Sequence, residues 1–167
     1  YDLRSDHEVE VHPDVEVAGA TWTQLEVKGI PMDAVSDLHD RVTAHDTMRQ
    51  VYRGFVEVEG ARAAFSALFH AIADGEGGAL FHCTAGKDRT GLVAMLMLSL
   101  AGVEQAIILE DYARTGEMIA PMIDEILEDA VSRGVDIEAF RPLLACNPDT
   151  MAATLAHPID THGSVEA

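Results

Sequence analysis

Cys83 and Arg89 have the spacing in this chain that is most suggestive of chemistry, because five residues separate them on a short polar loop. The loop follows a short apolar run, 79–83, and precedes a longer one, 90–100, that predicts a buried helix. At a helix N-terminus the backbone N–H groups of such a loop point inward and form an anion cradle. A thiolate at the floor of the cradle and a guanidinium at its rim favour a phosphoryl group as the ligand.

The chemistry that these residues predict is nucleophilic catalysis at phosphorus. The pKa of a free thiol is about 8.5, and a helix N-terminus or a nearby cation lowers it, so Cys83 is expected to react as a thiolate. Its attack would give a cysteinyl-phosphate that water hydrolyses. Arg89 would hold two equatorial oxygens, most tightly in the transition state. Thr90 would hydrogen-bond the sulfur, and Gly86 would let the loop turn tightly.

A nucleotide-binding loop is one alternative, because Gly86 and Lys87 resemble the core of that motif. The match fails at two positions. Asp88 stands where the motif requires serine or threonine, and Phe81 stands where its first glycine belongs.

Two other classes of protein also carry such a loop. A catalytically weak module that binds phosphate or phosphoinositides would keep the cradle, but the presence of Cys83, Arg89 and Thr90 together favours an enzyme. A thiol redox or arsenate-reducing enzyme would need a resolving cysteine close by, and the helix after the loop contains none. Cys146, the second cysteine, is expected to be a buried free thiol.

The elements around the loop predict an α/β fold with a small, mostly parallel central sheet flanked by helices and a helical C-terminal half. The expected strands are the end of one strand at 1–5 and two further strands at 21–28 and 79–83. Helices are expected over 32–57, 60–74, 90–100, 103–118 and 119–132, with shorter elements within 134–147 and 148–156. An irregular connection is expected over 6–20 and a turn at 157–167. This arrangement puts Cys83 where a strand end meets a helix N-terminus, a common ligand site in such sheets.

Composition predicts one globular domain, since 48% of the 167 residues are apolar and 24% are charged. The net charge of −18 argues against nucleic-acid binding and against general attraction to anionic membranes. An anionic substrate must therefore be drawn in by a local positive site. The longest apolar run, 91–102, is too short to insert stably into a bilayer.

Cofactor and compartment are predicted from sparse signals. His7, Glu8, Glu10 and His12 offer metal-ligand atoms, but their spacing closes no ligand set, so we expect no metal and no cofactor. Two cysteines favour reduced thiols over a disulfide framework. The cytoplasm is the default compartment, with secretion left open because the chain starts at Tyr1 in what looks like a strand.

Residues 82–91, His-Cys-Thr-Ala-Gly-Lys-Asp-Arg-Thr-Gly, resemble the signature loop of the protein tyrosine phosphatase superfamily, most closely that of its bacterial tyrosine/lipid phosphatase branch. Further segments resemble the same family: Asp2-Leu3-Arg4-Ser5 with Glu8, Asp111-Tyr112 and residues 163–167. The resemblance covers nearly the whole chain. It implies a single phosphatase domain, 1–167, without the first strands and last helix of the family.

The resemblance also implies roles for single residues. Cys83 would be the nucleophile, Arg89 the phosphate clamp, and His82 would orient the loop and keep the pKa of the thiol low. The cradle would consist of the backbone N–H groups of Thr84, Ala85, Gly86, Lys87, Asp88 and Arg89. The Lys87-Asp88 pair implies phosphoinositides as substrates beside phosphotyrosine, since a second cation could hold a second phosphate. Phosphoserine and phosphothreonine are further candidate substrates.

The general acid stays open between two aspartates. Protonation of the leaving oxygen needs a carboxylic acid within hydrogen-bond reach. Family analogy favours Asp2, which is expected at the end of a strand near the loop, whereas Asp88 already lies in the loop. Asp111 is a third candidate, but on a helix it is expected to be a solvated or structural acid.

Overall fold

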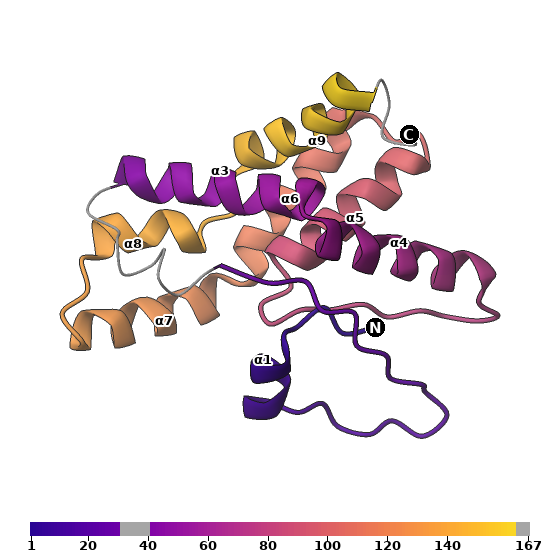
Figure 1. Ribbon diagram of the computed structural model, residues 1–167. Coiled ribbons are helices and arrows are strands. Elements are labelled where there is room, and N and C mark those ends of the chain that lie inside the picture. The colour runs from indigo at the N-terminus through magenta and orange to yellow at the C-terminus, as the bar shows by residue number, and fades with distance from the viewer. Residues whose placement is uncertain (31–40, 163–167) are drawn as a thin grey trace.

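The computed structural model describes residues 1–30 and 41–162, and most of them are helical (Figure 1). The predicted helix start at 32–40 and the resemblance of 163–167 to the family lie outside the described residues. The helices are α1 (Asp6–Val11), α3 (Arg41–Glu57), α4 (Glu59–Asp74), α5 (Asp88–Leu100), α6 (Gln105–Met118), α7 (Ala120–Ser132), α8 (Ile137–Leu144) and α9 (Pro148–His162).

The helices that follow apolar periodicity lie close to where the sequence predicts them. α4 buries Ala61, Ala64, Phe65 and Leu68 on one face, as the stripe in its sequence indicates. α7 begins with a proline in its first turn, where the missing N–H costs nothing. The predicted turn after residue 156 is wrong as far as 162, because α9 continues to that residue.

α1 forms where the sequence predicts an irregular connection. Its N-cap, Ser5, accepts a hydrogen bond from the backbone N–H of Glu8, and the Glu8 side chain accepts one from the backbone N–H of Ser5. This reciprocal capping box satisfies two backbone donors that a helix N-terminus otherwise leaves open. The cap stabilises a helix of six residues that buries no side chain.

The predicted α/β fold with a central parallel sheet is wrong, because the described residues contain no β-strand. The segments expected as strands meet only at isolated parallel bridges that join Asp2 to Gln24 and to His82. The backbone N–H of Asp2 donates to the Thr23 carbonyl at 2.9 Å, and the N–H of Leu3 donates to the His82 carbonyl at 2.9 Å. We call this meeting of residues 1–4, 23–27 and 80–83 the Asp2 junction.

The segments expected as strands do not form a sheet because each of them leaves the Asp2 junction after a few residues. The chain turns into α1 directly after Ser5, which caps that helix, so the first segment has no room for a longer ladder. In the third segment Leu80 is 74% exposed, although its apolar run was expected to be buried. Short apolar runs of this kind do not by themselves distinguish a strand from a buried extended segment.

α5 is the central helix of the body. Leu92, Val93 and Met95 are buried on it, and it packs against α6 and α9. The apolar run 91–102 therefore contributes these three residues to the core, whereas residues 100–102 are exposed. Within the described part of the chain, no helix has the length and apolar character needed to cross a membrane.

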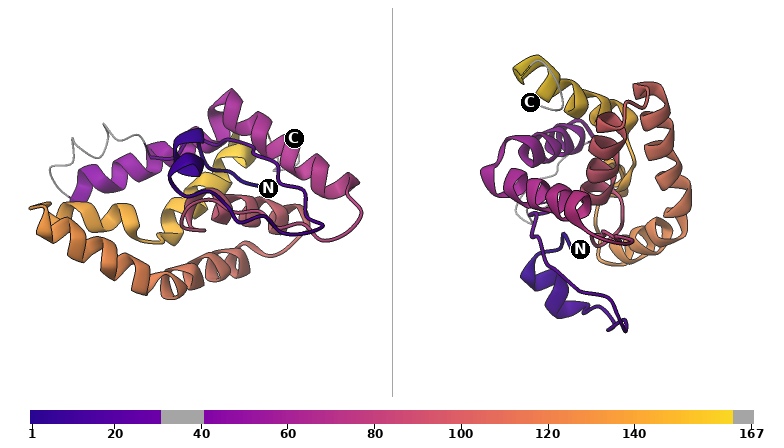
Figure 2. Two further views of the ribbon diagram at one scale, coloured as in Figure 1. Left: turned by 90° about the horizontal axis from the view of Figure 1, so that it is seen from below. Right: turned by 90° about the vertical axis from the view of Figure 1, so that its right-hand side faces the viewer.

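The N-terminal segment enters the core at two points and otherwise projects from it. Leu3 and Val27 are fully buried in the same apolar cluster as α5. Between them α1 and the loop after it extend away from the helical body (Figures 1 and 2). The Asp2 junction thus fixes the base of this projection next to the loop that carries Cys83.

Candidate active site

The loop from Cys83 to Lys87 joins the Asp2 junction to the N-terminus of α5. His82 pairs with Asp2 through the junction, and Cys83 follows it with 7% of its surface exposed. Gly86 has φ of +67°, a left-handed conformation that glycine adopts without steric cost. α5 begins at Asp88, so the loop residues lie at its N-terminal end. The residues expected to form the cradle, 84–89, therefore cover this loop and the first two residues of α5.

Arg89 reaches back from the first turn of α5 into a set of acceptors from distant parts of the chain. Its Nη1 donates to the carbonyls of Leu3 and Val27 at 3.2 Å each, and to Glu8 Oε2 at 2.8 Å. Its Nη2 donates to Glu8 Oε1 at 2.6 Å and to Thr84 Oγ1 at 3.3 Å. The side chain is 8% exposed. The guanidinium is therefore fixed in position.

Cys83 and Arg89 are electrostatically coupled. Burial lowers the pKa of Arg89, but the hydrogen bond to Glu8 and the negative charges of Cys83 and Asp88 outweigh it, so the pKa is raised. A nearby cation favours the thiolate form of a cysteine. The structure thus brings together the two residues that the sequence singles out.

The Thr90 hydroxyl is available for a further interaction. Its Oγ1 is buried and makes no hydrogen bond to any of the described residues. A buried hydroxyl without a partner is uncommon in folded proteins and calls for an explanation. The predicted hydrogen bond from Thr90 to the sulfur therefore stays a prediction, with a hydroxyl free to make it.

Glu8 is a site residue that sequence reasoning missed as such. Its carboxylate accepts from five donors: the two terminal nitrogens of Arg89, the backbone N–H and hydroxyl of Ser5, and the hydroxyl of Thr84. Burial raises its pKa, but the hydrogen bonds from Arg89, Thr84 and Ser5 lower it far below the usual glutamate range. The Ser-x-x-Glu capping box was the available signal, since it predicts a fixed glutamate at residue 8.

Asp2 lies beside the loop but is bound to Arg4. Its carboxylate accepts from the Arg4 backbone N–H at 2.9 Å and from Arg4 Nη2 at 2.7 Å, and it is fully buried. Burial alone raises the pKa of Asp2, but the hydrogen bonds and charge of Arg4 bring it below its usual value. An aspartate held as its anion is a poor proton donor. The position predicted for Asp2 near the loop is thus observed, with a partner that favours its ionised form.

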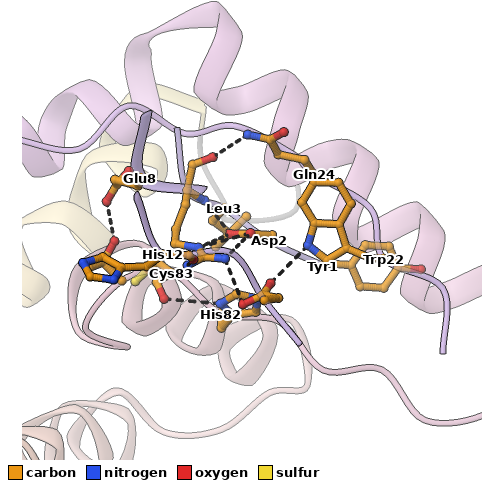
Figure 3. A network of polar contacts seen from close by, with 12 residues as sticks. Tyr1, Asp2, Leu3, Glu8, His12, Trp22, Gln24, His82 and Cys83 are labelled. Carbon is orange, nitrogen blue, oxygen red and sulfur yellow. Dashed lines mark hydrogen bonds and ion pairs between the residues drawn. The ribbon is translucent and has the colours of Figure 1, made fainter. Parts of the chain in front are cut away.

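A polar cluster surrounds this pair (Figure 3). The ligand atoms of Asp2, Asp14 and His82 all lie within 4.8 Å of one another. Arg4 Nη2 contacts Asp14 at 2.9 Å as well as Asp2, and His82 Nε2 lies 3.2 Å from Asp14. Arg4 supplies a positive charge to the two carboxylates, so the cluster is an ion-pair network that orients His82.

Lys87 and Asp88 form a second ion pair behind the loop. Lys87 Nζ lies 3.2 Å from Asp88 Oδ1 and donates to the Leu143 carbonyl, near the end of α8, at 2.6 Å. Lys87 is 4% exposed. The Lys87 ammonium therefore binds groups of the protein itself, whereas the family resemblance implies that it binds a second phosphate.

Two buried tyrosines continue from this pair. Tyr52 of α3 donates to Asp88 Oδ1 at 2.7 Å, and its hydroxyl lies 2.7 Å from that of Tyr112 on α6. Burial raises the pKa of both hydroxyls well above the usual tyrosine value, so both stay protonated. Asp111, next to Tyr112, is exposed and lines a small cavity of about 130 Å³ with Gly86. Asp111 takes no part in the hydrogen bonds that join Tyr52, Tyr112 and Asp88.

A cysteine and an arginine around one loop, at the N-terminus of a helix, are the arrangement expected for a thiol-based anion cradle. The whole chain, residues 1–167, matches the model of the tyrosine phosphatase family. The chain therefore belongs to the tyrosine phosphatase family, which confirms the resemblance seen in its sequence.

Two relatives show how far the similarity extends. A tyrosine-protein phosphatase of Nostoc commune is 58% identical over 50 residues, which are 29% of this chain and 17% of the relative. The triple specificity protein phosphatase PtpB of Mycobacterium tuberculosis is 30% identical over 106 residues, 64% of this chain and 37% of the relative. The chain thus spans less than half the length of these curated relatives.

Proposed function

We propose that residues 1–167 form a phosphatase domain that hydrolyses phosphotyrosine through a cysteinyl-phosphate intermediate. The observation that carries the proposal is that buried Cys83 begins the loop that leads into α5, while Arg89 is fixed in the first turn of that helix. Family membership supports a phosphatase acting on phosphorylated substrates. The unpartnered Thr90 hydroxyl adds a donor where the sulfur and the phosphoryl group would meet.

The reaction would proceed in two displacements. The Cys83 thiolate attacks phosphorus, the S–P bond forms, and the P–O bond to the tyrosine ring breaks as a general acid gives its proton to the leaving oxygen. Arg89 and the backbone N–H groups of the loop stabilise the charge on the equatorial oxygens. Water then attacks phosphorus, the S–P bond breaks, and inorganic phosphate leaves with the thiolate restored.

Asp88 is our choice for the general acid. It is the first residue of α5, directly after the loop, and its side chain is 19% exposed, whereas Asp2 is fully buried against Arg4. Asp2 is better suited to fix Arg4 and His82 at the junction. Family analogy favours Asp2, and both carboxylates have a cationic partner, since Lys87 and Tyr52 bind Asp88. The greater exposure of Asp88 is the reason for choosing it instead.

Phosphotyrosine in proteins is the substrate class that we favour. The M. tuberculosis relative bears the name triple specificity phosphatase, and the argument for phosphoinositides in this chain rested on Lys87 as a second cation. Because the Lys87 ammonium donates to the Leu143 carbonyl, that charge is engaged by the protein. We therefore expect turnover of a phosphotyrosine peptide to exceed turnover of phosphoinositides in vesicles.

The test of the proposed function is turnover of p-nitrophenyl phosphate by the full-length protein. Activity should be insensitive to EDTA, abolished in Cys83→Ser, and kept in Cys146→Ser, which changes the other free thiol. A wild-type protein that binds inorganic phosphate without turning over substrate would instead identify a phosphate-binding module.

A further inference from the structure

We infer that Tyr52 and Tyr112 are positioning residues for the general acid, because they fix one oxygen of Asp88 and leave the other to carry the transferred proton. The inference rests on the proposed function and on the choice of Asp88 as the acid. It adds two side chains from outside the loop, one on α3 and one on α6, that neither displacement step uses directly.

Two donors converge on the same oxygen of Asp88. The Tyr52 hydroxyl donates to Oδ1 at 2.7 Å, and Lys87 Nζ lies 3.2 Å from the same atom. Oδ2 makes no hydrogen bond to a described residue and is not among the buried atoms without a partner, which fits a side chain that is 19% exposed. Because Oδ1 already accepts from two donors, a proton on Asp88 belongs on Oδ2.

The hydrogen bonds from the tyrosines run in one direction. A tyrosine hydroxyl has a single hydrogen and a carboxylate can only accept, so the hydrogen of Tyr52 is committed to Asp88. The Tyr112 hydroxyl lies 2.7 Å from that of Tyr52 and must therefore be the donor in their contact. Each hydroxyl thus holds the next group, and the chain of hydrogen bonds ends at Oδ1.

Both tyrosines are anchored in the core. Tyr52 is 1% exposed and Tyr112 is 5% exposed, and both belong to the main apolar cluster. Burial raises the pKa of both hydroxyls well above the usual tyrosine value, so neither loses its hydrogen in the physiological range. The two hydroxyls consequently remain donors toward Asp88 whether or not Asp88 carries a proton.

Anchoring one oxygen of an acid matters because proton transfer depends on geometry. The acid must lie within hydrogen-bond reach of the leaving oxygen, and donors set in place beforehand need no reorganisation during the reaction. The proton passes from Oδ2 of Asp88 to the leaving oxygen as the P–O bond breaks. The negative charge that develops on the carboxylate is then stabilised by the donors at Oδ1.

A competing interpretation is that the donors at Oδ1 hold Asp88 as its anion and hinder its use as an acid, since hydrogen bonds to the charged form of a carboxyl group favour that form. Removal of the Tyr52 hydroxyl would then raise the rate with a poor leaving group, whereas a positioning role predicts a loss. A merely structural role predicts the same loss for every leaving group.

The experiment measures kcat/KM of the full-length protein on phenyl phosphate and on p-nitrophenyl phosphate. Tyr52→Phe should lower the value for phenyl phosphate about 10-fold, a fraction of what a general acid contributes, and leave that for p-nitrophenyl phosphate nearly unchanged. Tyr112→Phe should give a smaller loss of the same kind. Tyr1→Phe is the matched control, because the hydrogen bonds of Tyr1 to described residues run through its backbone. Both of its values should match the wild type.

A second arm tests whether Tyr52 acts through Asp88. In an Asp88→Asn background the proton donor is missing, so Tyr52→Phe should add no further selective loss on phenyl phosphate, as expected for directly coupled residues. The thermal midpoint of each variant shows whether it is folded. If Tyr52→Phe fails to fold, Tyr112→Phe decides by the same criterion, because it leaves the Tyr52 hydroxyl in place.

The inference would be overturned by an equal loss on both substrates, by unchanged or raised kcat/KM on phenyl phosphate, or by an undiminished selective loss in the Asp88→Asn background. Asp88→Asn without a selective loss of its own would also overturn it, since the acid would then be another residue. Absence of turnover in the wild type would overturn the proposed function, and the inference with it, a result distinct from all the others.

Discussion

At the scale of single residues, the loop and its surroundings are built from matched charges. Arg4 pairs with Asp2, Arg89 with Glu8 and Lys87 with Asp88, each at 3.2 Å or less. Because each of these cations has a carboxylate partner, we expect the backbone N–H groups of the loop to supply much of the attraction for an anion. If the site binds phosphate as proposed, it must attract the anion at short range, within a chain whose net charge is −18.

The choice of general acid is a residue-scale prediction. Asp88→Asn should lower kcat much more on phenyl phosphate than on p-nitrophenyl phosphate, because a poor leaving group depends more on protonation. General acid catalysis contributes about 100-fold or more, so the loss on phenyl phosphate should reach that size. Steady-state rates with both substrates measure it.

Asp2→Asn is the comparison for that experiment. It should lower both rates by a similar factor, since Asp2 holds Arg4. A selective loss on phenyl phosphate in Asp2→Asn, with none in Asp88→Asn, would assign the acid to Asp2 instead.

At the scale of elements, the start of α5 depends on how closely α6 approaches it. A Cβ at Gly91 would lie 3.0 Å from Cε2 of Tyr112 and 3.1 Å from its Cδ2. The absence of a side chain at Gly91 thus lets the Tyr112 ring reach the Tyr52 hydroxyl, which in turn binds Asp88. The two tyrosines connect α3 and α6 to the first residue of α5.

Gly91→Ala should therefore destabilise the protein, although alanine normally favours a helix. Overpacking of this kind costs about 1–3 kcal/mol. Urea unfolding measures the change, and Gly60→Ala in α4 is the matched control because nothing lies within 4 Å of its new Cβ. That control should be neutral or stabilising by about 1 kcal/mol. Equal stability of the two variants would show that Tyr112 moves aside without cost.

The helices could be predicted from sequence because apolar spacing reports directly on one buried face, as in α4. The absence of a sheet could not be predicted. Asp2 forms one bridge to Gln24 and one to His82, and whether such bridges extend into a ladder depends on where each segment leaves its neighbour. Cys83 and Arg89 were identifiable because they are close in sequence. Glu8 was not, since its role arises from contact between residues that are 81 positions apart.

At the scale of the whole molecule, most of the 29 acidic residues contribute little to the pH dependence of stability when they are exposed. Asp2 and Glu8 are different, because the structure lowers the pKa of both. In each case burial raises the pKa and the hydrogen bonds from arginine and its neighbours outweigh it. A lowered pKa contributes stability that is present above the unfolded value, about 4, and is lost as pH falls through the folded value.

The free energy of unfolding should therefore separate wild type from Asp2→Asn most at pH 7. Breaking a buried ion pair costs about 3 kcal/mol, and the difference should shrink below about pH 4 as Asp2 becomes protonated in the wild type. Urea titrations from pH 7 to pH 3 measure it, with Asp74→Asn on the exposed end of α4 as control. A difference that stayed constant with pH would mean that Asp2 contributes through packing rather than charge.

The Asp2 junction gives the site a particular kind of dynamics. Backbone hydrogen bonds, such as those donated by the amides of Leu3, Leu25 and His82, hold three segments together there. Among the described residues these bridges are isolated and do not extend into a ladder. Local opening of one of these bonds frees the neighbouring segment, so amide exchange at residues far apart in sequence would proceed as one cooperative unit. Because Cys83 directly follows His82, opening of the junction would also release the backbone of Cys83 from its position before α5.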